Sequence, residues 1–279
     1  MSIDSEISGH YTRGDLLARL RAALLEDGVD LEHASIETLA PFDQFHGRGL
    51  EATEEVAAAL AVSASDHLLD VGSGIGGPAR YFADRFGCRV TGLDLTAEFC
   101  AIARHLTQAL GLDDRVVFEH GDATAMPFAD AGFDGAYAMN VSMNIADKAR
   151  FYAEIHRVLR PGAWLVLSEI AQGPTGRPDY PTPWARTAAT SFLATPSEIR
   201  EGLEACGFEV LKSRDTVKQA LAFGARSRAM VELGQKPPQR AVHLIHGDLA
   251  AEAIANATRG IADARLIPIE VFAKKPNGG

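Results

Sequence analysis

Short apolar runs alternate with amphipathic segments across the middle of this chain. Each run has the length of a buried strand, and each intervening segment repeats its apolar residues at helical spacing. This alternation is typical of β-α units that build a mostly parallel sheet. The pattern predicts strands at 67–71, 89–94, 116–120, 133–139 and 164–170, and helices between them at 78–86, 97–110 and 148–159.

Two more strand patterns follow, at 208–213 and 266–274. Together with the earlier runs they predict an α/β fold with a seven-stranded, mostly parallel, doubly wound sheet. Between these last two strands, residues 215–264 show helical patterns that are broken at 234–238. We expect this insertion to form a cap near the carboxyl ends of the strands, where an α/β enzyme closes on its substrate.

The region before the sheet also has helical character, at 15–26 and 53–61. We therefore expect three parts in the chain: an N-terminal helical extension and lid, a sheet domain and an inserted cap. The predicted boundaries are 1–65 for the extension, 66–214 with 265–275 for the sheet domain, and 215–264 for the cap.

Composition and charge restrict the classes of partner. With 47% hydrophobic and 23% charged residues, the chain of 279 residues has the balance of an ordinary globular protein. A net charge of −10 argues against a general affinity for nucleic acid or an anionic membrane, because either would need a basic face. The polar start lacks the features of a signal peptide, and no apolar run approaches the roughly 20 residues that span a bilayer. We expect a cytoplasmic protein without membrane insertion.

Metal-binding and disulfide patterns are weak. Cys88, Cys100 and Cys206 are too scattered for a disulfide framework or a zinc cluster. His243 and His246 could share one helix face, but a metal would need a further ligand. We therefore expect no metal site.

A glycine-rich turn follows the first predicted strand. Gly72, Gly74 and Gly77 satisfy the G-x-G-x-x-G pattern of dinucleotide sites, and such a turn brings bare backbone N–H groups up to a ligand. Asp70 changes this interpretation, since a carboxylate just before the turn would repel a pyrophosphate. A cationic ligand would be attracted instead. S-adenosylmethionine carries an ammonium and a sulfonium group, and Asp70 could hold the ammonium directly or through water.

Two further acids follow the next two strands. Asp94 closes the second strand, where a carboxylate can accept both hydroxyls of a ribose. Asp122 follows the third strand and is predicted to lie at the same edge of the sheet. The three carboxylates, with no Lys or Arg inside the glycine turn, favour an adenosine ligand with positive charge and no phosphate.

The motif of Asp70, Gly72, Gly74 and Gly76 resembles the first motif of the S-adenosylmethionine-dependent methyltransferases, which are Rossmann-like proteins. The resemblance extends over about residues 40–212 and is similar to the small-molecule group that includes sterol, tocopherol and sarcosine/dimethylglycine methyltransferases. It is carried by the stretches 42–46, 71–80, 143–145 and 157–162.

The resemblance implies roles for individual residues. In that family the acid matching Asp122 accepts from the adenine amino group, and the backbone of the next residue, Ala123, serves the ring nitrogen. Asn140 is expected under the methionine part of the cofactor. The expected cofactor-binding residues are Asp70, Gly72, Ser73, Gly74, Asp94, Leu95, Asp122, Ala123 and Asn140.

Methyl transfer from a sulfonium needs alignment and the exclusion of water rather than a covalent residue. His46, in an aromatic and glycine-flanked loop, is the first candidate for a base, and Asn144 is a candidate for direct substrate contact. The acceptor is expected to be a small molecule with a carbon, nitrogen or oxygen nucleophile, and the chain could form a homodimer. Two alternatives stay open: a non-catalytic module that binds the same cofactor, and an NAD-dependent oxidoreductase.

Overall fold

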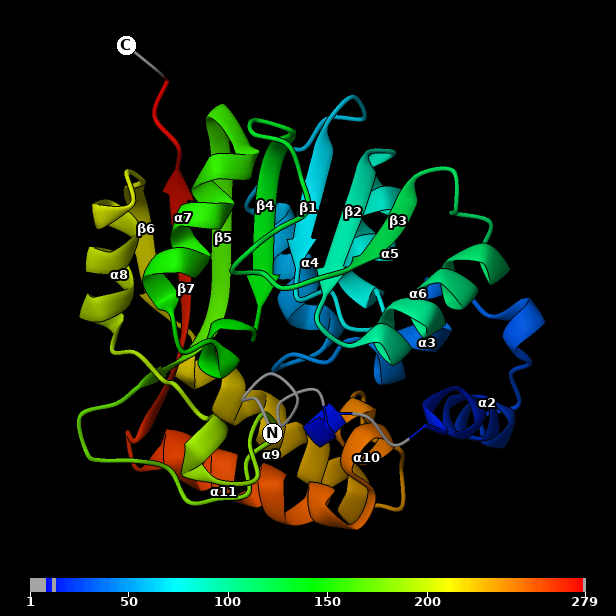
Figure 1. Ribbon diagram of the computed structural model, residues 1–279. Helices are drawn as coiled ribbons and strands as arrows, with labels where there is room; N and C mark the ends of the chain where they lie inside the picture. Colours follow the sequence, from blue (N-terminus) through cyan, green and yellow to red (C-terminus); the bar gives the residue numbers. More distant parts are fainter. Residues whose placement is uncertain (1–8, 12–13, 278–279) are drawn as a thin grey trace.

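Seven strands form a single sheet in the computed structural model, which describes residues 9–11 and 14–277 (Figure 1). They are β1 (His67–Val71), β2 (Arg89–Asp94), β3 (Val116–His120), β4 (Phe133–Met139), β5 (Leu159–Gln172), β6 (Glu209–Asp215) and β7 (Leu266–Lys274). The strand order is β3-β2-β1-β4-β5-β7-β6. The first five strands are parallel, whereas β7 runs antiparallel to both β5 and β6. The predicted α/β fold with a mostly parallel sheet is confirmed.

The helices lie in three groups, seen in Figure 1 around the sheet and below it. The helices before or between the parallel strands are α2 (Leu16–Glu26), α3 (Ile36–Asp43), α4 (Leu50–Ala58), α5 (Gly77–Phe86), α6 (Ala97–Ala109) and α7 (Lys148–Val158), with 3-10 turns η1 (Leu31–His33) and η2 (Ser142–Asn144). Turn η3 (Ala188–Thr190) and helix α8 (Pro196–Ala205) precede β6. The cap consists of α9 (Val217–Glu232), α10 (Ala241–His246), η4 (Gly247–Leu249) and α11 (Ala250–Ala262).

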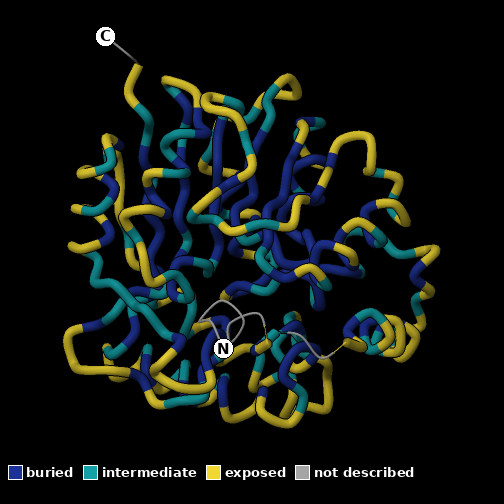
Figure 2. Tube along the Cα trace, viewed as in Figure 1, coloured by how far each residue is buried: buried dark blue, intermediate teal, exposed yellow. Residues whose placement is uncertain are grey.

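Strand alternation divides the core between the two faces of the sheet. Leu68 packs with residues of α4 and α5 on one face, whereas its neighbour Leu69 packs with residues of α7 and α8 on the other. The central strands are buried nearly throughout, and exposed residues gather at loops and outer helix surfaces (Figure 2). The carboxyl ends of the parallel strands all lie on the same side of the sheet, and the cap lies below these strand ends (Figure 1).

Several predicted boundaries differ from the structure, and two of these differences have a clear physical origin. Strand β5 begins at Leu159, which pairs with Phe133, and so it includes the Pro-Gly pair that was expected to separate helix from strand. Helix α3, which contains Pro41, lies between the helices predicted at 15–26 and 53–61, where no helix was predicted. A capping box between Ser35 and Thr38 starts this helix, and the burial of Leu39 and Phe42 offsets the hydrogen bond that proline removes.

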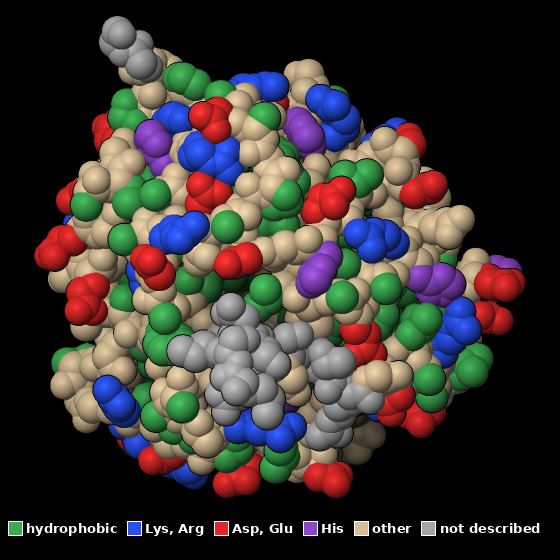
Figure 3. Space-filling model, viewed as in Figure 1, with side chains coloured by type: hydrophobic (Ala, Val, Ile, Leu, Met, Phe, Trp, Pro, Cys, Tyr) green, Lys and Arg blue, Asp and Glu red, His purple; other side chains and the backbone are tan. Residues whose placement is uncertain are grey.

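On the face drawn in Figure 3, acidic and basic side chains are interspersed, so neither sign of charge dominates there. Within the described ranges, no helix combines the length and apolar character needed to cross a membrane.

A buried ion pair joins the N-terminal extension to the sheet domain. Arg80 of α5 donates to the Asp43 carboxylate at 2.8 Å, and both side chains are almost fully buried. Arg80 also donates to the Thr107 hydroxyl at 3.2 Å. Breaking a buried pair is costly, because one charge is then left without compensation.

We expect Asp43→Ala to lower the free energy of unfolding by about 3–5 kcal/mol, since it leaves the Arg80 guanidinium buried and unpaired. Urea unfolding followed by circular dichroism measures this change. Glu204→Ala is the control, because its pair with Arg200 is exposed and should contribute no more than about 1 kcal/mol. Equal losses in the two variants would contradict the structural importance of the buried pair.

Candidate active site

A cavity of about 420 Å³ opens at the carboxyl ends of the parallel strands. Each of the first four strands of the chain supplies part of its wall through the residues that follow it. Among the residues predicted to bind a cofactor, those that line this cavity are Gly72, Gly74, Asp94, Leu95, Asp122, Ala123 and Asn140. The sheet topology thus brings together groups from four separate strand ends, and we call this space the first cavity.

The glycine turn between β1 and α5 is shaped for close approach. Gly72 has φ of +71°, and a Cβ atom there would lie 2.4 Å from a methyl carbon of Val141. The Gly72 and Ser73 N–H groups donate to the carbonyl of Leu93 at 2.7 and 3.0 Å. The turn is therefore held against the end of β2, and it packs so closely against Val141 that only glycine fits at position 72.

Asp94 connects two loops at the wall of the first cavity. Its Oδ2 accepts from the Gly74 N–H at 2.8 Å, and its Oδ1 accepts from the Thr96 N–H at 2.8 Å. Burial raises the pKa of Asp94 to about 6, although these two backbone hydrogen bonds lower it. The carboxyl group therefore fixes the glycine turn and still forms part of the cavity wall.

Asp122 lines the same cavity from an exposed position. Its Oδ1 accepts from the Thr124 N–H and its Oδ2 from the Thr124 hydroxyl, both at 2.7 Å. The turn after β3 is thereby ordered by the carboxylate itself, as in other Asx turns.

Asp70 and Ser73 lie behind the glycine turn, and in the described part of the chain neither lines the first cavity. Asp70 is 2% exposed and sits inside the strand, paired with Gly92 on one side and Tyr137 on the other. Burial raises its pKa to about 8, and the negative charge of Asp94 adds to the shift. In the protein alone Asp70 therefore keeps its proton at neutral pH. It can act on a cavity ligand through water, or through its own charge once a nearby positive charge lowers its pKa, while the side chains that line the wall are others.

Aromatic side chains cover the cavity on the side away from the strands. Tyr11, Phe45, Phe99 and Trp184 line it, and the ring centroids of Phe45 and Phe99 lie 5.3 Å apart. The sequence pattern did not point to Tyr11 or Phe99 as part of this cover, although Phe45 falls in the stretch 42–46 that carries the resemblance.

Asn144 lines the first cavity, and its side chain ties three segments together. Its amide nitrogen donates to the carbonyl oxygens of Trp184 and Thr190 at 2.8 and 3.1 Å. Its amide oxygen accepts from the Tyr11 hydroxyl at 3.0 Å. These bonds use the polar groups of Asn144 to hold the aromatic cover in place.

His46 lies outside both cavities described here, as far as the described residues define them. Its Nε2 is 3.1 Å from the Gln44 side-chain oxygen and 3.0 Å from the Thr53 hydroxyl, and its Nδ1 is 3.2 Å from the Gly47 carbonyl. Burial lowers its pKa to about 4, so the ring is neutral at pH 7. Both ring nitrogens face protein groups, and the imidazole shapes the 44–49 loop from beneath.

A second cavity, of about 740 Å³, lies between the cap and the sheet. It shares Asn140 and Val242 with the first cavity, so the two spaces meet at these residues. Asn140 has φ of +59°. With its amide nitrogen toward the Ser168 carbonyl and its oxygen toward the Gly47 N–H, both at 3.2 Å, it bridges β5 and the 44–49 loop.

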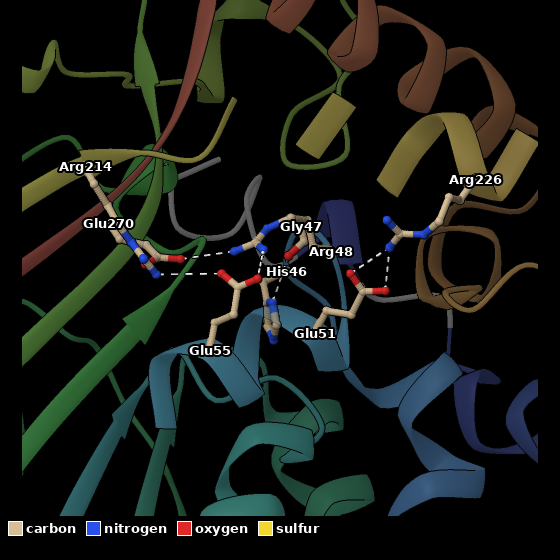
Figure 4. A network of polar contacts seen from close by, with 8 residues as sticks. All are labelled: His46, Gly47, Arg48, Glu51, Glu55, Arg214, Arg226 and Glu270. Carbon is tan, nitrogen blue, oxygen red and sulfur yellow. Dashed lines mark hydrogen bonds and ion pairs between the residues drawn. The ribbon is translucent and has the colours of Figure 1, made fainter. Parts of the chain in front are cut away.

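The 44–49 loop is fixed by an ion-pair network, drawn in Figure 4. Arg48 pairs with Glu55 at 2.7 Å and with Glu270 at 3.1 Å, and Arg214 pairs with Glu270 at 2.6 Å. Arg226 of α9 separately pairs with Glu51 of α4 at 2.6 Å. The loop is thus tied to the sheet, and the cap is tied to α4 beside it.

Among residues 9–11 and 14–277, no three or more His, Cys, Asp or Glu side chains form a group that could hold a metal ion.

Comparison with known proteins places these features in context. A family model described as "Methyltransferase domain" matches residues 69–167. The methyltransferase GfsG of Streptomyces halstedii is 33% identical over 169 residues, covering 59% of this chain and 58% of the relative. The O-methyltransferase resE of Aspergillus sclerotiorum is 31% identical over 194 residues, covering 66% of this chain and 72% of the relative.

The match spans only about half the length of several relatives, among them a sterol 24-C-methyltransferase of Eremothecium gossypii, for which it covers 43%. Among solved structures, the [4+2]-cyclase SpnF superposes with a TM-score of 0.68 at 25% identity. That similarity covers 94% of this chain and 95% of SpnF.

The buried carboxyl groups make stability depend on pH. The pKa of Asp70 is raised from 3.8 to about 8, so the folded protein keeps a proton that the unfolded chain has lost across the interval between those values. Stability contributed by this proton is fully present below about pH 4 and is lost progressively up to about pH 8.

We therefore expect Asp70→Asn, which cannot ionise, to become more stable relative to the unsubstituted protein as pH rises from 5 to 8, by an amount on the order of a few kcal/mol. Urea unfolding at the two pH values measures the difference. An identical pH dependence in both proteins would show that Asp70 does not carry the effect, and Asp113→Asn, at an exposed position, serves as the control.

Proposed function

This chain belongs to the methyltransferase family, and from that premise we propose that it transfers the methyl group of S-adenosylmethionine to a small-molecule acceptor. The observation that carries the proposal is the meeting of two cavities at Asn140 and Val242. One cavity has the acids and the glycine turn that suit a cationic adenosine cofactor, and the other is large enough for an acceptor. A donor and an acceptor held in adjoining spaces need only alignment and the exclusion of water.

The residues of the first cavity fit this cofactor. In this proposal Asp94 accepts from the two ribose hydroxyls and Asp122 accepts from the adenine amino group, and both residues line the first cavity. Gly72 and Gly74 line the first cavity without side chains, so the methionine part can lie against the backbone of the turn. An ammonium group bound near the turn would be stabilised by the ionised forms of Asp70 and Asp94, and its positive charge would lower the raised pKa values of both carboxyl groups.

The acceptor is held by the second cavity in this proposal. When bound, the cofactor supplies a methyl group already activated on a sulfonium. The chain supplies the rest: Asn140 keeps the strand end and the 44–49 loop in fixed positions between the two spaces, and the aromatic cover excludes water from the first cavity. The sequence pattern leads us to propose further that the protein acts in the cytoplasm.

The similarity to SpnF supports a second candidate, formation of a ring in the second cavity without methyl transfer. Mass spectrometry of the product separates the two functions, because methyl transfer adds one CH₂ unit and releases S-adenosylhomocysteine. A product with the same mass as its substrate, and no released S-adenosylhomocysteine, would favour the ring-forming reaction or a binding role over methyl transfer.

We expect Asp94→Asn to weaken S-adenosylhomocysteine binding by about 10- to 100-fold, in keeping with the loss of hydrogen bonds to a charged group. Isothermal titration calorimetry measures the affinity, and circular dichroism verifies that the variant is folded. The control is Asp113→Asn, at an exposed position away from the cavities.

Equal affinity in the two variants would remove Asp94 from the site. Failure of the unsubstituted protein to bind S-adenosylhomocysteine, or tight binding of NADH in its place, would overturn the proposed cofactor.

A further inference from the structure

The second cavity has walls of two kinds. Toward the cap its wall is mainly apolar, with Ala220 and Phe223 from α9, Ile254 from α11, and Ile170 and Pro268 from the sheet. Toward the first cavity its wall is polar, formed by Asn140, Ser168 and Glu169 together with the 44–49 loop. A molecule that fills this space must therefore be mainly apolar and must present a polar atom at its inner end.

Glu169 provides a buried carboxyl group at that inner end. It lies near the end of β5, is 2% exposed, and lines the second cavity. Its Oε1 accepts from the Ser142 N–H at 3.1 Å and from the Val141 N–H at 3.3 Å. Its Oε2 accepts from the Ser142 N–H at 3.2 Å. These donors fix the carboxyl group beside Asn140, and each oxygen keeps capacity to accept a further hydrogen bond.

The electrostatic surroundings of Glu169 suit proton transfer. Burial raises its pKa to about 7, while the backbone donors and the Lys148 ammonium lower it. Tyr152 lies close enough to interact with the same charge. The other charged or titratable side chains on the cavity wall are Arg48, Arg228, Glu232, His243 and Arg259.

The buried arginine of this wall is already neutralised. Arg48 is paired with Glu55 and Glu270, and Glu270 is paired again with Arg214 (Figure 4). Two guanidinium groups therefore balance two carboxylates. Among the described residues of the inner end, no buried cation is therefore left unpaired for an anionic acceptor, and the ionisable group that lines this end without a direct ion pair is the Glu169 carboxyl.

We propose that the acceptor is an uncharged, mainly apolar molecule with a hydroxyl group, and that Glu169 accepts the proton of that hydroxyl during methyl transfer. This inference rests on the proposed methyltransferase function. The apolar body fills the space between α9, α11 and the sheet, and the hydroxyl lies between Glu169 and Asn140. As the acceptor oxygen bonds to the methyl carbon, the sulfur–methyl bond breaks and its electron pair stays on sulfur. The hydroxyl proton passes to the Glu169 carboxylate, which later releases it to water.

The acceptor class is tested with probes that have the same number of carbon atoms. Dodecan-1-ol and cyclododecanol are uncharged alcohols, whereas dodecanoic acid and dodecylamine carry opposite charges at neutral pH. We expect the alcohols to bind the S-adenosylhomocysteine complex at least tenfold more tightly than the acid or the amine, as measured by calorimetry, and to release S-adenosylhomocysteine when S-adenosylmethionine is supplied. Tighter binding of the acid or the amine, or no binding of either alcohol, would overturn the proposed class.

The role of Glu169 is tested with Glu169→Gln, which keeps an oxygen that can accept from the Ser142 N–H. We expect kcat toward the better alcohol to fall by about 10²- to 10⁴-fold, with KM and S-adenosylhomocysteine affinity within about threefold of the unsubstituted protein. Glu169→Asp, which keeps a carboxylate, should retain more activity than the Gln variant. Glu209→Gln, at an exposed position on β6, is the control and should leave kcat unchanged.

A pH profile separates proton transfer from a purely structural role. In the unsubstituted protein kcat should rise with pH as Glu169 ionises, with the midpoint of the rise near its pKa of about 7, and in Glu169→Gln this rise should be absent. A Gln variant with unchanged kcat, or one that keeps the rise, would exclude Glu169 as the proton acceptor. If the unsubstituted protein binds S-adenosylhomocysteine but neither alcohol, this inference alone is defeated. If it does not bind S-adenosylhomocysteine, the proposed function is defeated as well.

Discussion

The Asp94 carboxyl group makes the contact on which the ligand-binding edge depends. One oxygen holds the glycine turn after β1 and the other holds the turn after β2, both through backbone N–H groups at 2.8 Å. Because neighbouring parallel strands end at the same edge, this single side chain fixes two loops that are far apart in the sequence. The cavity wall is therefore already formed in the protein alone, which lowers the conformational entropy that the protein loses when a ligand binds.

Charges buried elsewhere are compensated by opposite charges from distant parts of the chain. Arg80 of α5 pairs with Asp43 of α3, and Arg48 joins the 44–49 loop to Glu270 in β7. A buried pair contributes little net stability compared with apolar packing, but it strongly penalises arrangements in which one partner is missing. These pairs thus fix where the N-terminal helices sit relative to the sheet.

The strand pattern was sufficient to predict the sheet and much of the first cavity. Asp94, Asp122 and Asn140 each stand at or just after a strand end, and all parallel strands end at one edge, so their meeting follows from the apolar spacing. Asp70 stands one position before its strand ends, where alternation directs the side chain to a face of the sheet rather than to the edge. The burial of Asp70 behind the glycine turn follows from its position in this alternation of side chains along β1.

Other features depend on tertiary contacts that a local pattern does not contain. The Thr53 hydroxyl beneath the 44–49 loop provides a partner for His46 and turns the ring away from the cavities. Glu169 stands within an apolar strand pattern, and its importance depends on the backbone of η2 and on the cap, which are distant in the sequence. Helix α3 formed through Pro41 because burial of its apolar face outweighed the local preference for a break.

The attachment of the cap has a consequence for how such a protein can diversify. The chain leaves the sheet at the end of β6 and returns at the start of β7, and these points are adjacent: Asp215 pairs with Ile269, and the Thr216 N–H donates to the Pro268 carbonyl at 2.8 Å. Closing a loop costs an entropy that grows only slowly with its length. The segment between the two strands can therefore be lengthened, shortened or exchanged in evolution at little cost to the sheet, so that new acceptor chambers can arise on an unchanged cofactor edge.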